Sequence, residues 1–124
     1  MMVTVDLAET GKRELNQRLH GLTTDTEERC WQVLNPRGQH SLAAGLDAPV
    51  SVEIMGHAGY YCAGMNKQAT IRIKGNAGPG TAENMMSGVV WVKGNASESA
   101  GAMALLRGFA APMHAETAAP GVEL

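Results

Sequence analysis

The sequence predicts an all-β fold, a right-handed parallel β-helix that forms a short solenoid with an N-terminal capping helix. Three observations predict it: a segment that repeats at a fixed spacing, a short strand of alternating polarity in each repeat, and linkers too long for hairpins. The chain has 124 residues, which is the size of a single domain.

The repeat occupies residues 50–101. Each copy closes its strand with a glycine, and these glycines, Gly56, Gly75 and Gly94, are evenly spaced along the chain. A fixed period of about 20 residues is typical of a solenoid, in which each copy packs only on its neighbours. Roughly a dozen residues separate successive strands, whereas a β-meander joins its strands through about two to five. The spacing therefore favours a coil of about 19 residues over a meander.

Each copy opens with a strand whose apolar residues are β-branched and alternate with mostly polar ones. Stacking the copies in parallel, about 4.8 Å apart, gives two interior ladders. The predicted coil core is Val52 and Ile54, Ile71 and Ile73, and Val90 and Val92. Glycine and asparagine at the corners are expected to supply the positive φ angles that tight turns need.

Residues 1–48 are interpreted as an N-terminal cap and lead-in. The alternation of Val3, Val5 and Leu7 indicates an edge strand. A helix should follow, with Thr10 as its N-cap and Gly21 as a left-handed C-cap. Its apolar stripe is Leu15, Leu19 and Leu22. We expect this stripe to cover the open first coil; docking of a partner subunit is the alternative.

The lead-in continues with a strand over Cys30–Leu34, and residues 41–46 are interpreted as a degenerate first strand of the coil. The coils span residues 49–103, and residues 104–124 form a divergent alanine-rich tail. The next strand-closing glycine is due at position 113, which is Met113. The rung of Val90 and Val92 should therefore lack a successor, which predicts a homo-oligomer or a partner at that end.

Composition and charge exclude several classes of function. The chain has 10 basic and 12 acidic residues in mixed order, so nothing predicts nucleic-acid binding. No apolar run approaches the roughly 20 residues that span a bilayer, and the N-terminus lacks a secretory pattern. We expect a cytoplasmic protein that does not bind membranes, with Cys30 and Cys62 as buried thiols rather than a disulfide.

The sequence predicts no catalytic, cofactor-binding or metal-ligating residue. Residues 75–80 match neither phosphate-binding glycine pattern, and the four histidines lack zinc-site spacing. Cys62 with His57 as its base is a candidate nucleophile, but a cysteine in an Ala-Gly corner is more often a small packing residue.

The candidate interface consists of the unusual residues at the corners. They are Arg37, Gly59, Tyr60, Tyr61, Cys62, Gly64, Met65, Gly78, Gly80, Glu83, Asn84, Met85, Met86 and Gly88.

These corners carry a resemblance to a known family. Asn35-Pro36-Arg37-Gly38, Tyr-Tyr-Cys-Ala-Gly-Met at residues 60–65 and Ala-Glu-Asn-Met-Met-Ser-Gly at residues 82–88 resemble the GXGXG β-helix domain of the glutamate synthase family. The chain looks closest to the stand-alone β-helix subunit of N-methylglutamate synthase and related complexes. The resemblance covers residues 5–101; family members continue with further coils where this chain has its tail.

The resemblance implies a non-catalytic scaffold subunit. In that family the β-helix accompanies an amidotransferase-like subunit and a glutamate-synthase-like subunit that holds FMN and an iron–sulfur cluster. The methylamine branch makes N-methylglutamate from methylamine and glutamate.

The alternative is an autonomous solenoid that binds or processes a small molecule or glycan. Solenoid enzymes of that class usually carry an acidic and aromatic groove, whereas the outward ladder here is Glu53, Arg72 and Trp91. We expect Glu53 and Arg72 to pair across rungs as a weak surface contact.

Overall fold

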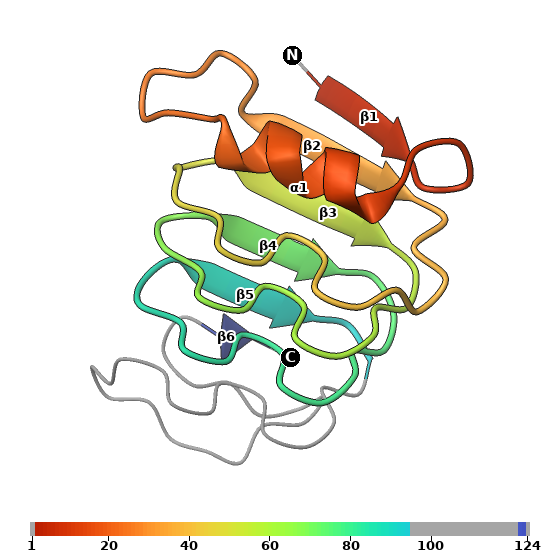
Figure 1. The fold of residues 1–124 in the computed structure, drawn as a ribbon. Helices are drawn as coiled ribbons and strands as arrows, with labels where there is room; N and C mark the ends of the chain where they lie inside the picture. Colours follow the sequence, from red (N-terminus) through yellow and green to blue (C-terminus); the bar gives the residue numbers. More distant parts are fainter. Residues whose placement is uncertain (1, 95–121, 124) are drawn as a thin grey trace.

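The computed structural model describes residues 2–94 and the backbone of residues 122–123. Six parallel strands form one sheet in chain order, and one helix, α1 (Lys12–His20), lies between the first two. The strands are β1 (Met2–Asp6), β2 (Cys30–Leu34), β3 (Ser51–Met55), β4 (Thr70–Ile73), β5 (Val89–Val92) and β6 (Val122–Glu123). Figure 1 shows them stacked one below another, with the chain returning in front of the sheet between strands. The predicted parallel β-helix is confirmed.

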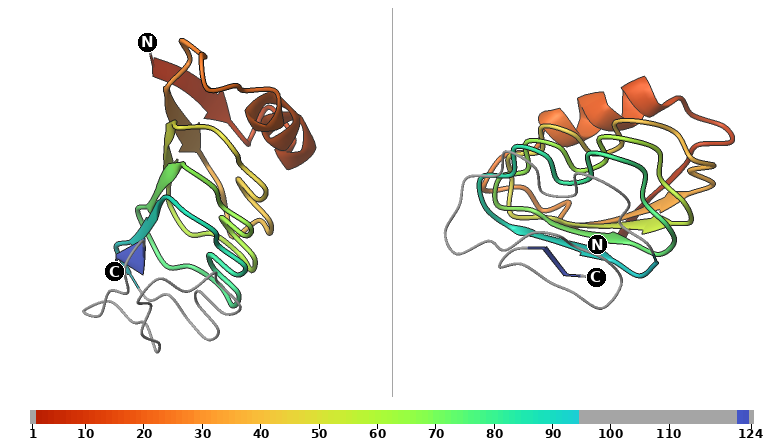
Figure 2. Two further views of the ribbon diagram at one scale, coloured as in Figure 1. Left: turned by 90° about the vertical axis from the view of Figure 1, so that its left-hand side faces the viewer. Right: turned by 90° about the horizontal axis from the view of Figure 1, so that it is seen from below.

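The path of the chain gives the handedness of the solenoid. All the strands run in the same direction on one side of the coil, and the chain returns on the side where α1 lies (Figures 1 and 2). Followed from the N-terminus, each coil also lies farther along the axis. This path turns right-handed, as parallel strand–crossover–strand connections nearly always do.

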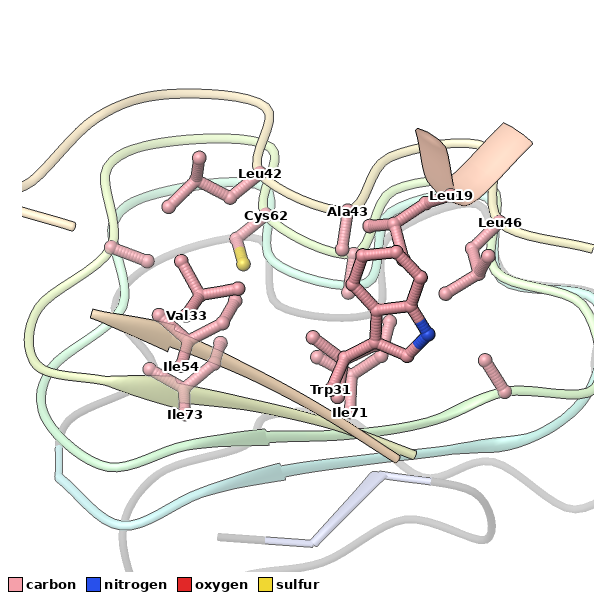
Figure 3. Packing of buried hydrophobic residues seen from close by; sticks show 14 of the residues in the cluster. Leu19, Trp31, Val33, Leu42, Ala43, Leu46, Ile54, Cys62, Ile71 and Ile73 are labelled. Atoms are coloured by element: carbon pink, nitrogen blue, oxygen red, sulfur yellow. The ribbon is translucent and has the colours of Figure 1, made fainter. Parts of the chain in front are cut away.

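The two interior ladders run from β1 to β5. Their registers align Val3, Trp31, Val52, Ile71 and Val90 in one ladder, and Val5, Val33, Ile54, Ile73 and Val92 in the other. Every member is buried, and Figure 3 shows several of them filling the coil. The predicted coil core is confirmed, and β1 and β2 from the lead-in extend it by two rungs because their alternation has the same phase.

Helix α1 forms the return segment of the first coil. Leu15 and Leu19 are buried and Leu22 packs against the core, so the predicted stripe is confirmed. Thr10 is not the N-cap, which is Gly11 with no side-chain hydrogen bond. Gly21 is the C-cap as predicted, but its φ of −78° lies in the right-handed region rather than the left-handed one. The chain leaves the helix through a tight turn in which the Leu22 N–H donates to the Leu19 carbonyl at 3.2 Å, so no left-handed residue is needed.

The polar face of α1 closes the first coil by hydrogen bonding. Lys12, Asn16 and His20, spaced four residues apart, point to the backbone of the next return segment. Asn16 bonds twice: its amide donates to the Ser41 carbonyl at 2.9 Å, and its Oδ1 accepts the Ala43 N–H at 3.0 Å. The predicted capping role is therefore confirmed, and side chains carry part of it.

The return segments at residues 40–47, 60–67 and 79–86 stack on one another, and we call this stack the return ladder. Backbone hydrogen bonds of 2.7–2.9 Å join its coils, among them Tyr61 N–H to Pro79 O and Ala63 N–H to Leu42 O. The segment at residues 41–46 belongs to this ladder, so its prediction as a strand is wrong.

Positive φ angles occur at alternate positions of the return ladder, and most belong to residues with side chains. They are Ser41, Ala43 and Gly45, then Tyr61, Ala63 and Met65, then Gly80, Ala82 and Asn84. The expectation that glycine and asparagine would supply these angles holds only in part. A left-handed residue costs roughly 1–2 kcal/mol when it carries a Cβ. The inter-coil hydrogen bonds and the burial of the three alanines and their neighbours offset this cost.

The C-terminal rung is not bare. Strand β6 pairs in parallel with β5, placing Val122 beside Val90 and Glu123 beside Trp91. The prediction that Val90 has no successor is therefore wrong, because two residues near the end of the alanine-rich tail supply a short strand. The rest of the tail lies outside the described residues. Within the described part of the chain, no helix has the length and hydrophobicity needed to cross a bilayer.

Candidate functional site

The return ladder brings the predicted corner residues together on one surface. Because successive coils keep their phase, the positions of His40, Tyr60 and Pro79 form one column, and those of Asp47, Lys67 and Met86 form another. Each column lines a separate surface depression. Residues that are one full repeat apart in the sequence thus become neighbours on a hydrogen-bonded surface.

The first depression, which we call the aromatic hollow, has a volume of about 420 Å³. It is lined by His40, Tyr60, Pro79, Gly80 and Glu83. The rings of His40 and Tyr60 pack with their centroids 4.1 Å apart and an interplanar angle of 38°. The Tyr60 N–H donates to His40 Nδ1 at 2.9 Å, so the neutral imidazole carries its proton on Nε2.

The second depression, the methionine hollow, is smaller, at about 260 Å³. Its lining is Gly45, Asp47, Met65, Lys67 and Met86. Met65 and Met86 are 45% and 46% exposed, and Tyr60 beside the aromatic hollow is 52% exposed. Large apolar side chains exposed over a rigid backbone, with polar residues between them, are typical of a protein-binding surface.

Cys62 does not belong to this surface. Figure 3 shows its sulfur directed into the coil, close to Leu42 and facing the strand ladder of Val33 and Ile54. Burial raises the pKa of the Cys62 thiol to about 12, so the group is a neutral thiol at physiological pH. His57 is exposed, and its Nδ1 accepts the Asn76 N–H at 2.8 Å. The geometry therefore favours the packing role over the nucleophile. The other cysteine, Cys30, is exposed, so the prediction that both thiols are buried is wrong.

The remaining predicted corner residues have structural positions. Met85 is buried in the coil, while Tyr61 and Asn84 are half-buried with φ angles of 58° and 59°. The pKa of Asp6 is lowered mainly by a hydrogen bond from the Asn35 side chain, and further by one from the Ala8 N–H. Arg37 is exposed, and its positive charge makes a smaller contribution in the same direction.

The corner glycines allow close approach between coils. A Cβ on Gly78 would lie 2.6 Å from the Gly59 carbonyl carbon. Gly88 has φ +91°, and a Cβ there would overlap the Ala69 carbonyl oxygen. Gly59 and Gly64 meet similar obstacles in His40 and the Tyr61 ring. These glycines are structural, because a side chain at any of them would force its neighbours apart.

The outer face of the sheet is held by a different contact from the one predicted. Glu53 lies beside Arg72 in register, but its ion pair is with Lys74, at 3.9 Å. Lys74 also lies 5.2 Å from the centroid of the Trp91 ring, which draws it toward β5. Within residues 2–94, no group of three His, Cys, Asp or Glu side chains is placed to hold a metal ion.

Sequence reasoning missed some of the residues that line the two hollows, namely His40, Gly45, Asp47, Lys67 and Pro79. The available signal was the repeat itself, extended one coil toward the N-terminus. His40 precedes Tyr60 by 20 residues, and Asp47 precedes Lys67 by 20 residues, so this coil is one residue longer than the 19-residue repeat. The segment at residues 41–46 was interpreted as a strand, which concealed this alignment.

No family model matches the chain, and no solved structure matches it significantly. The chain is similar to a curated protein of Rhizobium meliloti (strain 1021) named Protein GlxC, with 47% identity over 62 residues. The match covers 50% of this chain and 27% of the relative, so the chain spans about a quarter of the relative's length. The similarity supports a glutamate-synthase-like relationship at the level of the family.

Proposed function

We propose that this protein is a non-catalytic scaffold subunit of a cytoplasmic glutamate-synthase-type complex, the N-methylglutamate synthase that joins methylamine metabolism to glutamate. Its partners are an amidotransferase-like subunit and a glutamate-synthase-like subunit that carries FMN and an iron–sulfur cluster. The chemistry belongs to those partners. The similarity to Protein GlxC supports the type of complex.

The observation that carries the scaffold role is the exposed apolar surface of the return ladder. Tyr60, Met65 and Met86 project from a backbone held by inter-coil hydrogen bonds, so they lose little backbone freedom when a partner covers them. A buried thiol, Cys62, and two histidine rings engaged with backbone N–H groups are poorly placed for catalysis. The arrangement is suited to binding a protein.

The test is co-expression of the tagged chain with the amidotransferase-like and FMN-binding subunits of the same organism. We expect the three to purify together, and the isolated chain to lack glutaminase and methylamine-transfer activity. Met65→Asn with Met86→Gln should weaken the assembly, since asparagine keeps the left-handed backbone at residue 65 while removing apolar contact. Arg72→Ala, on the opposite face, is the matched control. Activity in the pure chain, or a failure of the subunits to associate, would refute the proposal.

A further inference from the structure

The aromatic hollow combines a fixed aromatic wall with a carboxylate. The wall is the His40–Tyr60 ring pair, and the hydrogen bond from the backbone N–H of Tyr60 to His40 Nδ1 fixes the imidazole against which the Tyr60 ring packs. Tyr60 keeps 52% of its surface exposed, so its ring remains accessible to a ligand.

Glu83 supplies the charge of the hollow. A Cβ added to Gly80 would lie 2.8 Å from Glu83 Oε2, so the carboxylate rests against the bare backbone of Gly80. Among the described residues, the Glu83 carboxylate has no hydrogen bond or ion pair. None of the five lining residues is a lysine or arginine. The hollow therefore presents a carboxylate that has no ion pair among the described residues and no lysine or arginine in its lining.

A planar cation fits these two features together. A guanidinium group stacks on an aromatic ring and donates two parallel hydrogen bonds to a carboxylate, whereas a lysine ammonium is compact and strongly hydrated. Arginine is also enriched among residues that dominate protein interfaces. The hollow, at about 420 Å³, has room for an arginine side chain.

We propose that the aromatic hollow binds an arginine side chain of a partner protein, which lies over the Tyr60 ring and pairs with Glu83. The inference rests on the proposed function, because the arginine belongs to a subunit that packs on the return ladder. The arginine contact with Tyr60 and Glu83 is the chemistry by which this protein would recognise that subunit.

The experiment is a titration of the full ¹⁵N-labelled chain with N-acetylarginine amide, followed by NMR. N-acetylcitrulline amide is the control probe, because it has nearly the same shape and no charge. We expect saturable shifts of the Tyr60, Gly80 and Glu83 amide signals with the arginine probe. The citrulline probe should bind about three- to tenfold more weakly, since it lacks the cation–π and charge-assisted contacts.

Two variants test the residues. Glu83→Gln should weaken the arginine probe by about three- to tenfold and reduce its preference over citrulline. The fold should survive, because the hydrogen bonds that join Glu83 to Gly80 and Met65 are made by backbone groups. Glu53→Gln, on the outer sheet face, is the matched control and should leave probe binding unchanged. Equal binding of the two probes, no saturable shift, or full binding by Glu83→Gln would overturn the inference.

The outcome is separable from that of the proposed function. If the three subunits assemble but the arginine probe does not bind, the hollow is not an arginine site and the scaffold role stands. If the probe binds but no complex forms, the hollow is a guanidinium site and the proposed complex is wrong.

Discussion

Replacing Asn16 with alanine tests how the solenoid is closed at its N-terminal end. Asn16 Oδ1 accepts a hydrogen bond from the Ala43 N–H. In the next coil the equivalent N–H, that of Ala63, donates to the backbone carbonyl of Leu42, so the Asn16 side chain takes the place of a backbone acceptor. Ala43 is buried, with 1% exposure, so its N–H would lose its hydrogen-bond partner in a site closed to water. Leaving a buried donor unpaired costs about 1–3 kcal/mol.

Two smaller effects accompany that loss. The Ser41 carbonyl loses the hydrogen bond from the Asn16 amide, and such a bond contributes about 0.5–1.5 kcal/mol to stability. Because Ser41 is only half-buried, water can replace part of this bond. Alanine is the better helix former by roughly 0.5 kcal/mol, which offsets part of the cost. The expected net loss of unfolding free energy is about 2 kcal/mol.

The assay is urea unfolding of the full chain followed by tryptophan fluorescence, with amide hydrogen exchange as the local readout. Gln17→Ala is the matched control, because residue 17 is the exposed neighbour on the same helix. We expect the Ala43 amide to exchange faster in Asn16→Ala and to keep its protection in the control. If both variants unfold within about 0.5 kcal/mol of each other, or if Ala43 stays protected, the side-chain closure is refuted.

Four further predictions concern the core, the thiols and the last strand. Ile73→Asp should lower the unfolding free energy by several kcal/mol, because it buries an unpaired carboxylate. Arg72→Ala, whose side chain points outward, should lower it by less than about 1 kcal/mol, and similar losses of thermal stability in both variants would contradict the assigned strand faces. A thiol reagent should label Cys30 in the native chain and Cys62 only after unfolding. Because burial raises the pKa of Cys62 from 9.0 to about 12, its stabilising contribution is complete below pH 9 and is lost as pH rises to 12. The unfolding free energy should fall by up to about 4 kcal/mol over this pH range. Cys62→Ala should lack this part of the pH dependence when its unfolding is measured over the same range. Deleting residues 122–124 should bare the edge of β5 and cause concentration-dependent association in light scattering; a monomer at all concentrations would show that β6 is not needed.

The sheet was predictable to the level of single residues. Val52, Ile71 and Val90 share a ladder in the structure as the sequence pattern predicted, because β-branched alternation with a period of two leaves one register that buries the apolar face. The predicted corner residues Tyr60, Met65 and Met86 also lie on one surface. The two hollows on that surface were not predicted, since each contains residues from the return segment at 40–47. That segment has no glycine or asparagine before Gly45 to mark its left-handed positions.

By itself, the sequence determined the solenoid period, the strand faces and the apolar stripe of α1. The strand faces and the stripe are local properties, set by side-chain periodicity along a few neighbouring residues, and the period is visible because the same strand pattern recurs along the chain. Only the tertiary structure decided where the left-handed residues of the return ladder lie, that Asn16 replaces a missing backbone carbonyl, and that β6 covers β5. Each of these depends on a hydrogen-bond partner in another coil, far away along the chain. The conformation of Ala63 is stable because Leu42 and Cys62 make inter-coil bonds around it, and no pattern within its own segment records those partners.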